Sequence, residues 1–119
     1  MPKLFLIHWD DREIEAYADE LRVLGWEVEH EDMDGSLAYR RVKAWQPDVV
    51  VIDLRYLPSH GRMTGMILRK APDTWEIPII FVDGKPEDVE KTKDTVFDAE
   101  FVTHKELPVA LEAIKSGEK

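Results

Sequence analysis

The sequence alternates five short segments typical of strands with five stretches whose apolar residues recur every three or four positions. The segments that we expect to be strands are residues 3–9, 26–31, 49–54, 77–82 and 100–103, of which residues 26–31 alternate apolar and polar residues. The amphipathic stretches, which we expect to be helices, are residues 10–25, 36–45, 63–70, 86–96 and 106–116. Strands that alternate with helices indicate a parallel sheet, because each connection between parallel strands crosses a face of the sheet. The pattern therefore predicts one doubly wound α/β domain over residues 1–119, with strand order 2-1-3-4-5.

Composition excludes several classes of function. The 119 residues contain no cysteine, which excludes disulfide scaffolds, thiolate zinc sites and cysteine nucleophiles. The 16 basic and 25 acidic residues give a net charge of −9, and such a surface repels nucleic acid. No run approaches the roughly 20 apolar residues of a membrane span, and the first apolar run is too short for a signal peptide. We therefore expect a cytoplasmic protein that binds neither nucleic acid nor membrane.

Carboxylates gather where the predicted strands end. Asp10 and Asp11 follow the first strand, Asp53 lies near the end of the third and Asp83 follows the fourth, while His104 follows the fifth. In open parallel sheets function is found at the carboxyl ends of the strands, beside the change in strand order, which here lies between strands one and three. An aspartate at a strand end is usually a turn former or helix cap, and that remains the alternative for Asp10 or Asp83 taken alone.

Asp53 is harder to explain as a turn former, because it interrupts the apolar run Val-Val-Val-Ile-Asp-Leu. A buried carboxylate is costly unless it meets a cation, hydrogen-bond donors or a proton. Two further carboxylates raise that cost, since like charges ~4 Å apart repel by about 4 kcal/mol at an effective dielectric constant of ~20. A divalent cation such as Mg²⁺, which takes oxygen ligands, would relieve the repulsion.

The loop after the third strand, Arg55-Tyr56-Leu57-Pro58-Ser59-His60-Gly61-Arg62, places positive charge beside these carboxylates. Two interpretations remain open. In the first, the loop binds a small anion through Ser59, His60, Arg62 and Arg55, because helix N-termini and guanidinium groups bind anions. Alternatively Ser59 caps a helix while Arg55 or Arg62 neutralises Asp53 and Asp83, so that the carboxylates coexist without metal.

Over nearly its whole length the chain resembles the receiver domain of two-component response regulators. The resemblance rests on the pair Asp10-Asp11, on Asp53 with Pro58 five residues later, and on Ile77–Val82 as strand four. It implies a flavodoxin-like three-layer sandwich in which Asp53 accepts a phosphoryl group from a histidine kinase. It also implies that Asp10, Asp11 and Asp53 hold Mg²⁺.

The resemblance extends to three switch positions, and the sequence departs from the family at two of them. Phe101 matches the switch aromatic residue on strand five. Asp83 stands where the family has Ser or Thr, and a carboxylate cannot donate a hydrogen bond to a phosphoryl oxygen. His104 stands where the family has Lys, and histidine is shorter and mostly neutral near pH 7.

These departures favour an atypical receiver or pseudo-receiver that acts through contact with a protein partner or a histidine kinase. The resemblance also implies that the chain can form a homodimer through its last two helices and its fifth strand. The main alternative is a Mg²⁺-dependent phosphoryl-transfer enzyme with Asp53 as nucleophile, Asp10 and Asp11 as metal ligands, and His60 or His104 as acid and base. A third hypothesis is a sensor of small anions that uses the Ser59–Arg62 loop.

Overall fold

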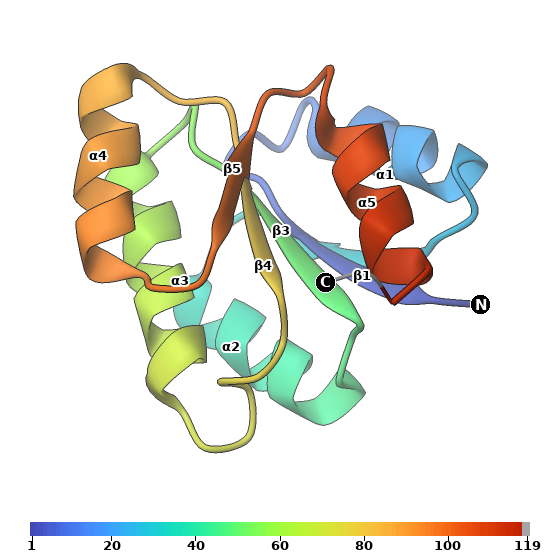
Figure 1. Ribbon diagram of the computed structural model, residues 1–119, viewed down its shortest axis with the longest axis horizontal. Coiled ribbons are helices and arrows are strands. Elements are labelled where there is room, and N and C mark those ends of the chain that lie inside the picture. The colour runs from blue at the N-terminus through green and yellow to red at the C-terminus, as the bar shows by residue number, and fades with distance from the viewer. Residues whose placement is uncertain (118–119) are drawn as a thin grey trace.

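The computed structural model describes residues 1–117 and shows a five-stranded parallel sheet between two layers of helices (Figure 1). The elements in chain order are β1 (Lys3–Ile7), α1 (Ile14–Val23), β2 (Glu27–Glu31), α2 (Gly35–Trp45), β3 (Val49–Asp53), α3 (Pro58–Lys70), β4 (Ile79–Val82), α4 (Pro86–Thr95), β5 (Glu100–Val102) and α5 (Leu107–Lys115). The strands lie in the order β2-β1-β3-β4-β5, and every neighbouring pair is parallel. The predicted fold class and strand order are therefore confirmed.

Two apolar cores cover the two faces of the sheet, because successive side chains of a strand point to opposite faces. Leu4 and Leu6 of β1 belong to the core that α1 and α5 complete, whereas Phe5 and Ile7 belong to the core on the other face. The second core is completed by residues of α2 and α3 and by Val96, which directly follows α4. Figure 1 shows this division, with α1 and α5 on one side of the sheet and α2, α3 and α4 on the other. The continuous apolar runs reflect burial from both sides.

The start of α3 differs from the prediction, which placed it near Met63. The helix begins at Pro58, and Leu57 before it adopts a left-handed backbone conformation with φ of 46°. Proline is well suited to the first turn of a helix, where its missing N–H would have no helical partner. Pro58 and Gly61 therefore lie inside the helix and not in a loop.

Other boundaries also shift: β1 ends at Ile7 and α1 begins at Ile14, whereas a strand over residues 3–9 and a helix over residues 10–25 were predicted. The cap of α2 is Asp34, whose carboxylate accepts hydrogen bonds from the backbone of Ser36 and Leu37, and Ser36 lies inside the helix. Strand β4 starts at Ile79, two residues later than predicted, because the Ile77 N–H is bonded to the Thr74 carbonyl in the preceding turn. Within residues 1–117 the longest helix has 13 residues, and none is both long and apolar enough to cross a membrane.

Gly65 supplies a testable link between sequence and packing. A Cβ atom at this position of α3 would lie 2.7 Å from Cζ of the buried Phe81 ring. We expect Gly65→Ala to lower the free energy of unfolding by about 1–3 kcal/mol, although alanine favours a helix by about 1 kcal/mol over glycine. Urea denaturation measures the difference, with Met63→Ala on the exposed side of α3 as control. Equal or higher stability of Gly65→Ala would contradict the packing described.

Candidate functional site

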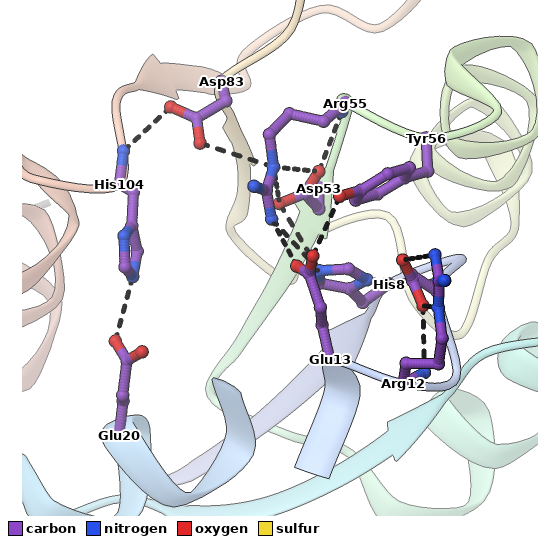
Figure 2. Close-up of polar contacts among 10 residues, drawn as sticks. His8, Arg12, Glu13, Glu20, Asp53, Arg55, Tyr56, Asp83 and His104 are labelled. Carbon is purple, nitrogen blue, oxygen red and sulfur yellow. Dashed lines mark hydrogen bonds and ion pairs between the residues drawn. The ribbon is translucent and has the colours of Figure 1, made fainter. Parts of the chain in front are cut away.

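The centre of the candidate site is Asp53, the last residue of β3, whose side chain has no exposed surface. Its Oδ1 accepts a hydrogen bond from the backbone N–H of Arg55 at 2.8 Å. The Arg55 side chain then folds back, and its Nε lies 3.3 Å from Oδ1 and 3.2 Å from Oδ2 (Figure 2). Because Arg55 follows Asp53 by only two residues, the turn that leaves β3 supplies both the backbone and the side-chain donor.

Arg55 joins three carboxylates that come from different parts of the chain. Its Nη2 donates to Glu13 Oε1 at 3.1 Å, and its Nε lies 3.7 Å from Asp83 Oδ2. The guanidinium carbon lies 5.1 Å from the centre of the Tyr56 ring, and the Tyr56 hydroxyl donates to Glu13 Oε2 at 2.9 Å. The Arg55 guanidinium group, only 39% exposed, thus offsets the negative charge at the C-terminal ends of the strands.

A buried histidine completes this group. His8 follows β1, has no exposed surface, and accepts the Asp10 backbone N–H on Nδ1 at 3.2 Å. Its Nε2 consequently faces the carboxylates, 3.4 Å from Glu13 Oε1 and 3.8 Å from Asp53 Oδ2. Nε2 also lies 3.3 Å from Nη2 of Arg55, so the buried ring contacts the guanidinium group of the cluster as well as its carboxylates.

The predicted metal ligands are not brought together. The Asp10 carboxylate is held by Arg12, whose backbone N–H, Nε and Nη2 lie 2.9, 3.1 and 3.1 Å from its oxygens, while Asp11 is exposed. Across residues 1–117, no group of three or more histidines and carboxylates is arranged to hold a metal ion. The oxygens of Asp10 and Asp53 face guanidinium groups, so the residues present do not fit Mg²⁺ in the way the sequence suggested.

The residues at the predicted switch positions are placed around this centre. Asp83 adopts a left-handed conformation with φ of 61°, and its Oδ1 accepts the His104 backbone N–H at 3.0 Å. The His104 ring turns away and contacts Glu20 of α1, with Nε2 2.9 Å from Oε2. Phe101 stacks on the buried Phe81 ring, the two ring centres being 5.2 Å apart.

The loop that suggested anion binding does not act as a unit. Of the four residues singled out there, Arg55 alone enters the carboxylate cluster. The His60 ring packs edge-on against the Trp9 ring, with the two ring centres 6.0 Å apart. Ser59 is exposed in the first turn of α3. Arg62 is half-buried, and its Nη1 is buried without a hydrogen-bond partner. The geometry therefore supports Arg55 as an internal counter-ion.

Glu13, Tyr56, His8 and Arg12 were not predicted as site residues. Glu13 and Arg12 lie in the segment that leads into α1 and look like ordinary polar residues before a helix. A signal was available for His8, because a histidine within a predicted buried strand must find polar partners. Glu13 lies three positions after Asp10, and the turn between them, with the Glu13 N–H bonded to the Asp10 carbonyl, places Glu13 beside His8 and Arg55.

The site's carboxylates should titrate in a distinct order. Burial raises the pKa of Asp53 above its ordinary 3.8, even though Arg55 opposes this effect. The Arg12 side chain lowers the pKa of Asp10 below 3.8, and the Tyr56 hydroxyl is the main cause that lowers the pKa of Glu13 below 4.5. A carboxylate with a lowered pKa stabilises the fold above its unfolded pKa, and this stabilisation is lost as the pH falls through the folded value. A raised pKa has the opposite effect, so that ionised Asp53 opposes folding.

We therefore expect carboxyl ¹³C NMR, recorded between about pH 2 and pH 7, to show Asp53 titrating above its ordinary pKa and above Asp10. The variant Arg12→Gln should move Asp10 upward and leave Asp53 in place, because Arg12 contacts only the first of these carboxylates. Titration of Asp53 at or below 3.8 would show that its carboxylate is not desolvated as the structure indicates.

Comparison with known proteins identifies the fold class. The sequence matches no protein-family model and no curated protein. The structure is similar to the signal receiver domain of a histidine kinase from Syntrophus aciditrophicus, with a TM-score of 0.80 and 22% identity over 100% of this chain and 93% of that one. The fold is thus that of CheY-like response-regulator receiver domains.

Two further similarities bear on the site. The pseudo-receiver domain of the CikA protein has a TM-score of 0.73 and 21% identity, covering 98% of this chain and 96% of that chain. The receiver domain of a sensor histidine kinase from Pseudomonas aeruginosa has a TM-score of 0.76 and 19% identity, covering 95% and 93%. That receiver domain holds a magnesium ion in its active-site cleft, so the fold occurs both with a metal-bound site and as a pseudo-receiver.

Proposed function

We propose that this protein is a receiver-like signalling module that acts by contacting another protein, and that an internal arginine keeps its phosphoacceptor position closed. The observation that carries the proposal is the position of Arg55. Its guanidinium group lies against both oxygens of Asp53 and also reaches Glu13 and Asp83. In this arrangement Arg55 supplies the positive charge that a buried carboxylate needs.

The closed site has two chemical consequences. An aspartate nucleophile attacks through a carboxylate oxygen, and both Asp53 oxygens are engaged by Arg55. The neighbouring carboxylate of Asp83 offers no hydrogen to a phosphoryl oxygen and is itself bonded to the His104 N–H. The site therefore favours a fixed signalling conformation over reversible phosphorylation.

The C-terminal elements supply a surface for protein contact. Within residues 1–117, strand β5 has β4 as its one strand neighbour, so one of its backbone edges has no strand partner there. Val109 of α5 is 76% exposed and lines a shallow cavity with Val102 and Ala110. An unpaired strand edge beside an exposed apolar residue is suited to a partner protein or a second copy of the chain.

The test is phosphorylation by a small phosphodonor. The protein is incubated with acetyl phosphate and Mg²⁺, and intact-mass spectrometry follows the addition of one phosphoryl group. We expect the wild-type chain to stay unmodified and Arg55→Gln to gain a phosphoryl group on Asp53, since the carboxylate then loses its guanidinium partner. The gain should vanish in the double variant Arg55→Gln with Asp53→Asn.

Arg62→Gln is the matched control, because it removes a guanidinium group from the same segment without touching Asp53. Circular dichroism verifies that each variant is folded. A second measurement uses the wild-type protein alone: amide NMR spectra should show no shifts around Asp53 when Mg²⁺ and beryllofluoride are added. Rapid phosphorylation of wild-type Asp53, or beryllofluoride shifts centred on it, would overturn the closed-site proposal.

A further inference from the structure

A second recessed surface lies at the opposite end of the sheet from the Arg55 site, where β4 and β5 begin. It is a cavity of about 470 Å³ between the connection from α3 to β4 and the connection from α4 to β5. Its lining consists of Arg69, Trp75, Glu76, Pro78, Phe97 and Asp98. In Figure 1 the α3–β4 connection lies at the bottom of the molecule, away from the loops that carry the Arg55 site.

Arg69 fixes the shape of this cavity. The residue is 5% exposed, and its guanidinium group donates to four backbone carbonyls, those of Trp75 (2.7 Å), Phe97 (2.9 Å), Ile77 (3.0 Å) and Asp98 (3.1 Å). These bonds tie together two connections that are about twenty residues apart in the sequence. The cavity is consequently preorganised, which reduces the conformational entropy lost when a ligand binds.

Two aromatic side chains of the lining remain open to solvent. Trp75 is 50% exposed and Phe97 is 58% exposed. The Arg69 guanidinium carbon lies 5.8 Å from the centre of the Phe97 ring. Large aromatic groups that are half exposed around one cavity mark a surface for molecular recognition.

Two acidic side chains stand beside these rings. Within residues 1–117 the carboxylates of Glu76 and Asp98 make no hydrogen bond or close ion pair, and Asp98 interacts with the Arg69 guanidinium group only through longer-range attraction. Arg69 is the one cationic residue of the lining, and its Nε, Nη1 and Nη2 are all directed at backbone carbonyls. Two carboxylates against one guanidinium group leave the cavity with a net negative charge.

We propose that this cavity binds a lysine or arginine side chain presented by a partner protein. Aromatic faces attract cations, and carboxylates add an ionic component, so the combination of Trp75, Phe97, Glu76 and Asp98 matches a basic side chain in both respects. The surface is independent of the Arg55 site, and its test does not depend on whether Asp53 is closed.

The test is an NMR titration of the full ¹⁵N-labelled chain with the capped peptide Ala-Arg-Ala. The control peptide carries citrulline, which has nearly the same shape as arginine without its charge. We expect saturable shifts of the Trp75 indole N–H and of the Phe97 and Asp98 amides with the arginine peptide, and binding at least about fivefold weaker with citrulline.

Two variants locate the interaction. Trp75→Ala should abolish the shifts of the Phe97 and Asp98 amides. The pair Glu76→Gln and Asp98→Asn should weaken binding about fivefold, and asparagine tolerates the left-handed conformation of Asp98, whose φ is 58°. Glu87→Gln, an exposed carboxylate in the first turn of α4, is the matched control and should leave binding unchanged.

Several outcomes would overturn the proposal. Equal binding of the citrulline peptide would show that charge is not recognised. Shifts centred on Asp53 would place the interaction at the other end of the sheet, where the strands terminate. Shifts of the Trp75 and Phe97 resonances on simple dilution of the protein would assign this surface to contact between copies of the chain.

Discussion

Replacing Arg69 by methionine is expected to lower the free energy of unfolding by about 3 kcal/mol. Methionine keeps most of the apolar volume but removes the donors that satisfy the carbonyls of Trp75, Ile77, Phe97 and Asp98. Each buried carbonyl without a partner costs about 1–3 kcal/mol, and water entering the adjacent cavity recovers part of that cost. The cost of burying the guanidinium group, which also lowers the pKa of Arg69, offsets another part.

Urea denaturation at pH 7 measures this effect, with Arg40→Met as control. Arg40 is an exposed residue of α2, and its replacement should change the free energy of unfolding by less than about 0.5 kcal/mol. A value for Arg69→Met within that same range would show that the four carbonyls do not depend on the guanidinium group.

The second large effect concerns Asp53 and Arg55, and the two single variants should differ. Arg55→Gln leaves a carboxylate with no exposed surface without its counter-ion, and we expect a loss of about 2 kcal/mol, because Arg55 itself is partly exposed and screened by solvent. Asp53→Asn should leave stability unchanged or raise it, since Arg55 keeps Glu13 and Asp83 as partners.

The pH dependence distinguishes this explanation from a general loss of packing. The pKa of Asp53 is raised by burial, so its ionisation opposes folding, and stability is lost as the pH rises through the folded pKa. Arg55→Gln should raise that pKa further and so make the total loss of stability larger, while the double variant Arg55→Gln with Asp53→Asn should recover most of the stability. Denaturation at about pH 4 and about pH 7 tests this. A double variant as unstable as Arg55→Gln would rule out the charge explanation.

The fold could be predicted because each strand and helix carries its own periodic pattern. The apolar run Val49–Leu54 and the helical spacing of Leu107, Ala110 and Leu111 indicate burial without any knowledge of the partners. The start of α3 was missed because Pro58 and Gly61 are usually associated with loops, whereas here Pro58 occupies the first turn and Gly61 packs against Ile52 and Trp9.

The site could be predicted only in part, because it depends on side chains that are brought together by tertiary structure. The burial of Asp53 follows from its place in an apolar run, and Arg55 was one of two candidate counter-ions. Whether Asp10 meets a metal or Arg12 depends on the turn before α1, which the sequence pattern does not define. Arg69 resembled an ordinary basic residue in the last turn of a helix, and only the structure shows it buried.

The position of β1 inside the sheet also determines the order in which the chain can assemble. β1 is hydrogen-bonded to β2 on one side and to β3 on the other, so residues 3–53 form a contiguous three-stranded unit. β4 adds to that unit through β3, and among the strands that the structure describes the three-residue β5 pairs with β4 alone. Amide hydrogen exchange should consequently be slowest in β1 and β3 and fastest among the strands in β5. Fraying of that last strand would expose the edge of β4 and release the bonds that join Asp83 to Val102 and His104, while the contacts between Asp53 and Arg55, on β3 and the turn after it, would remain.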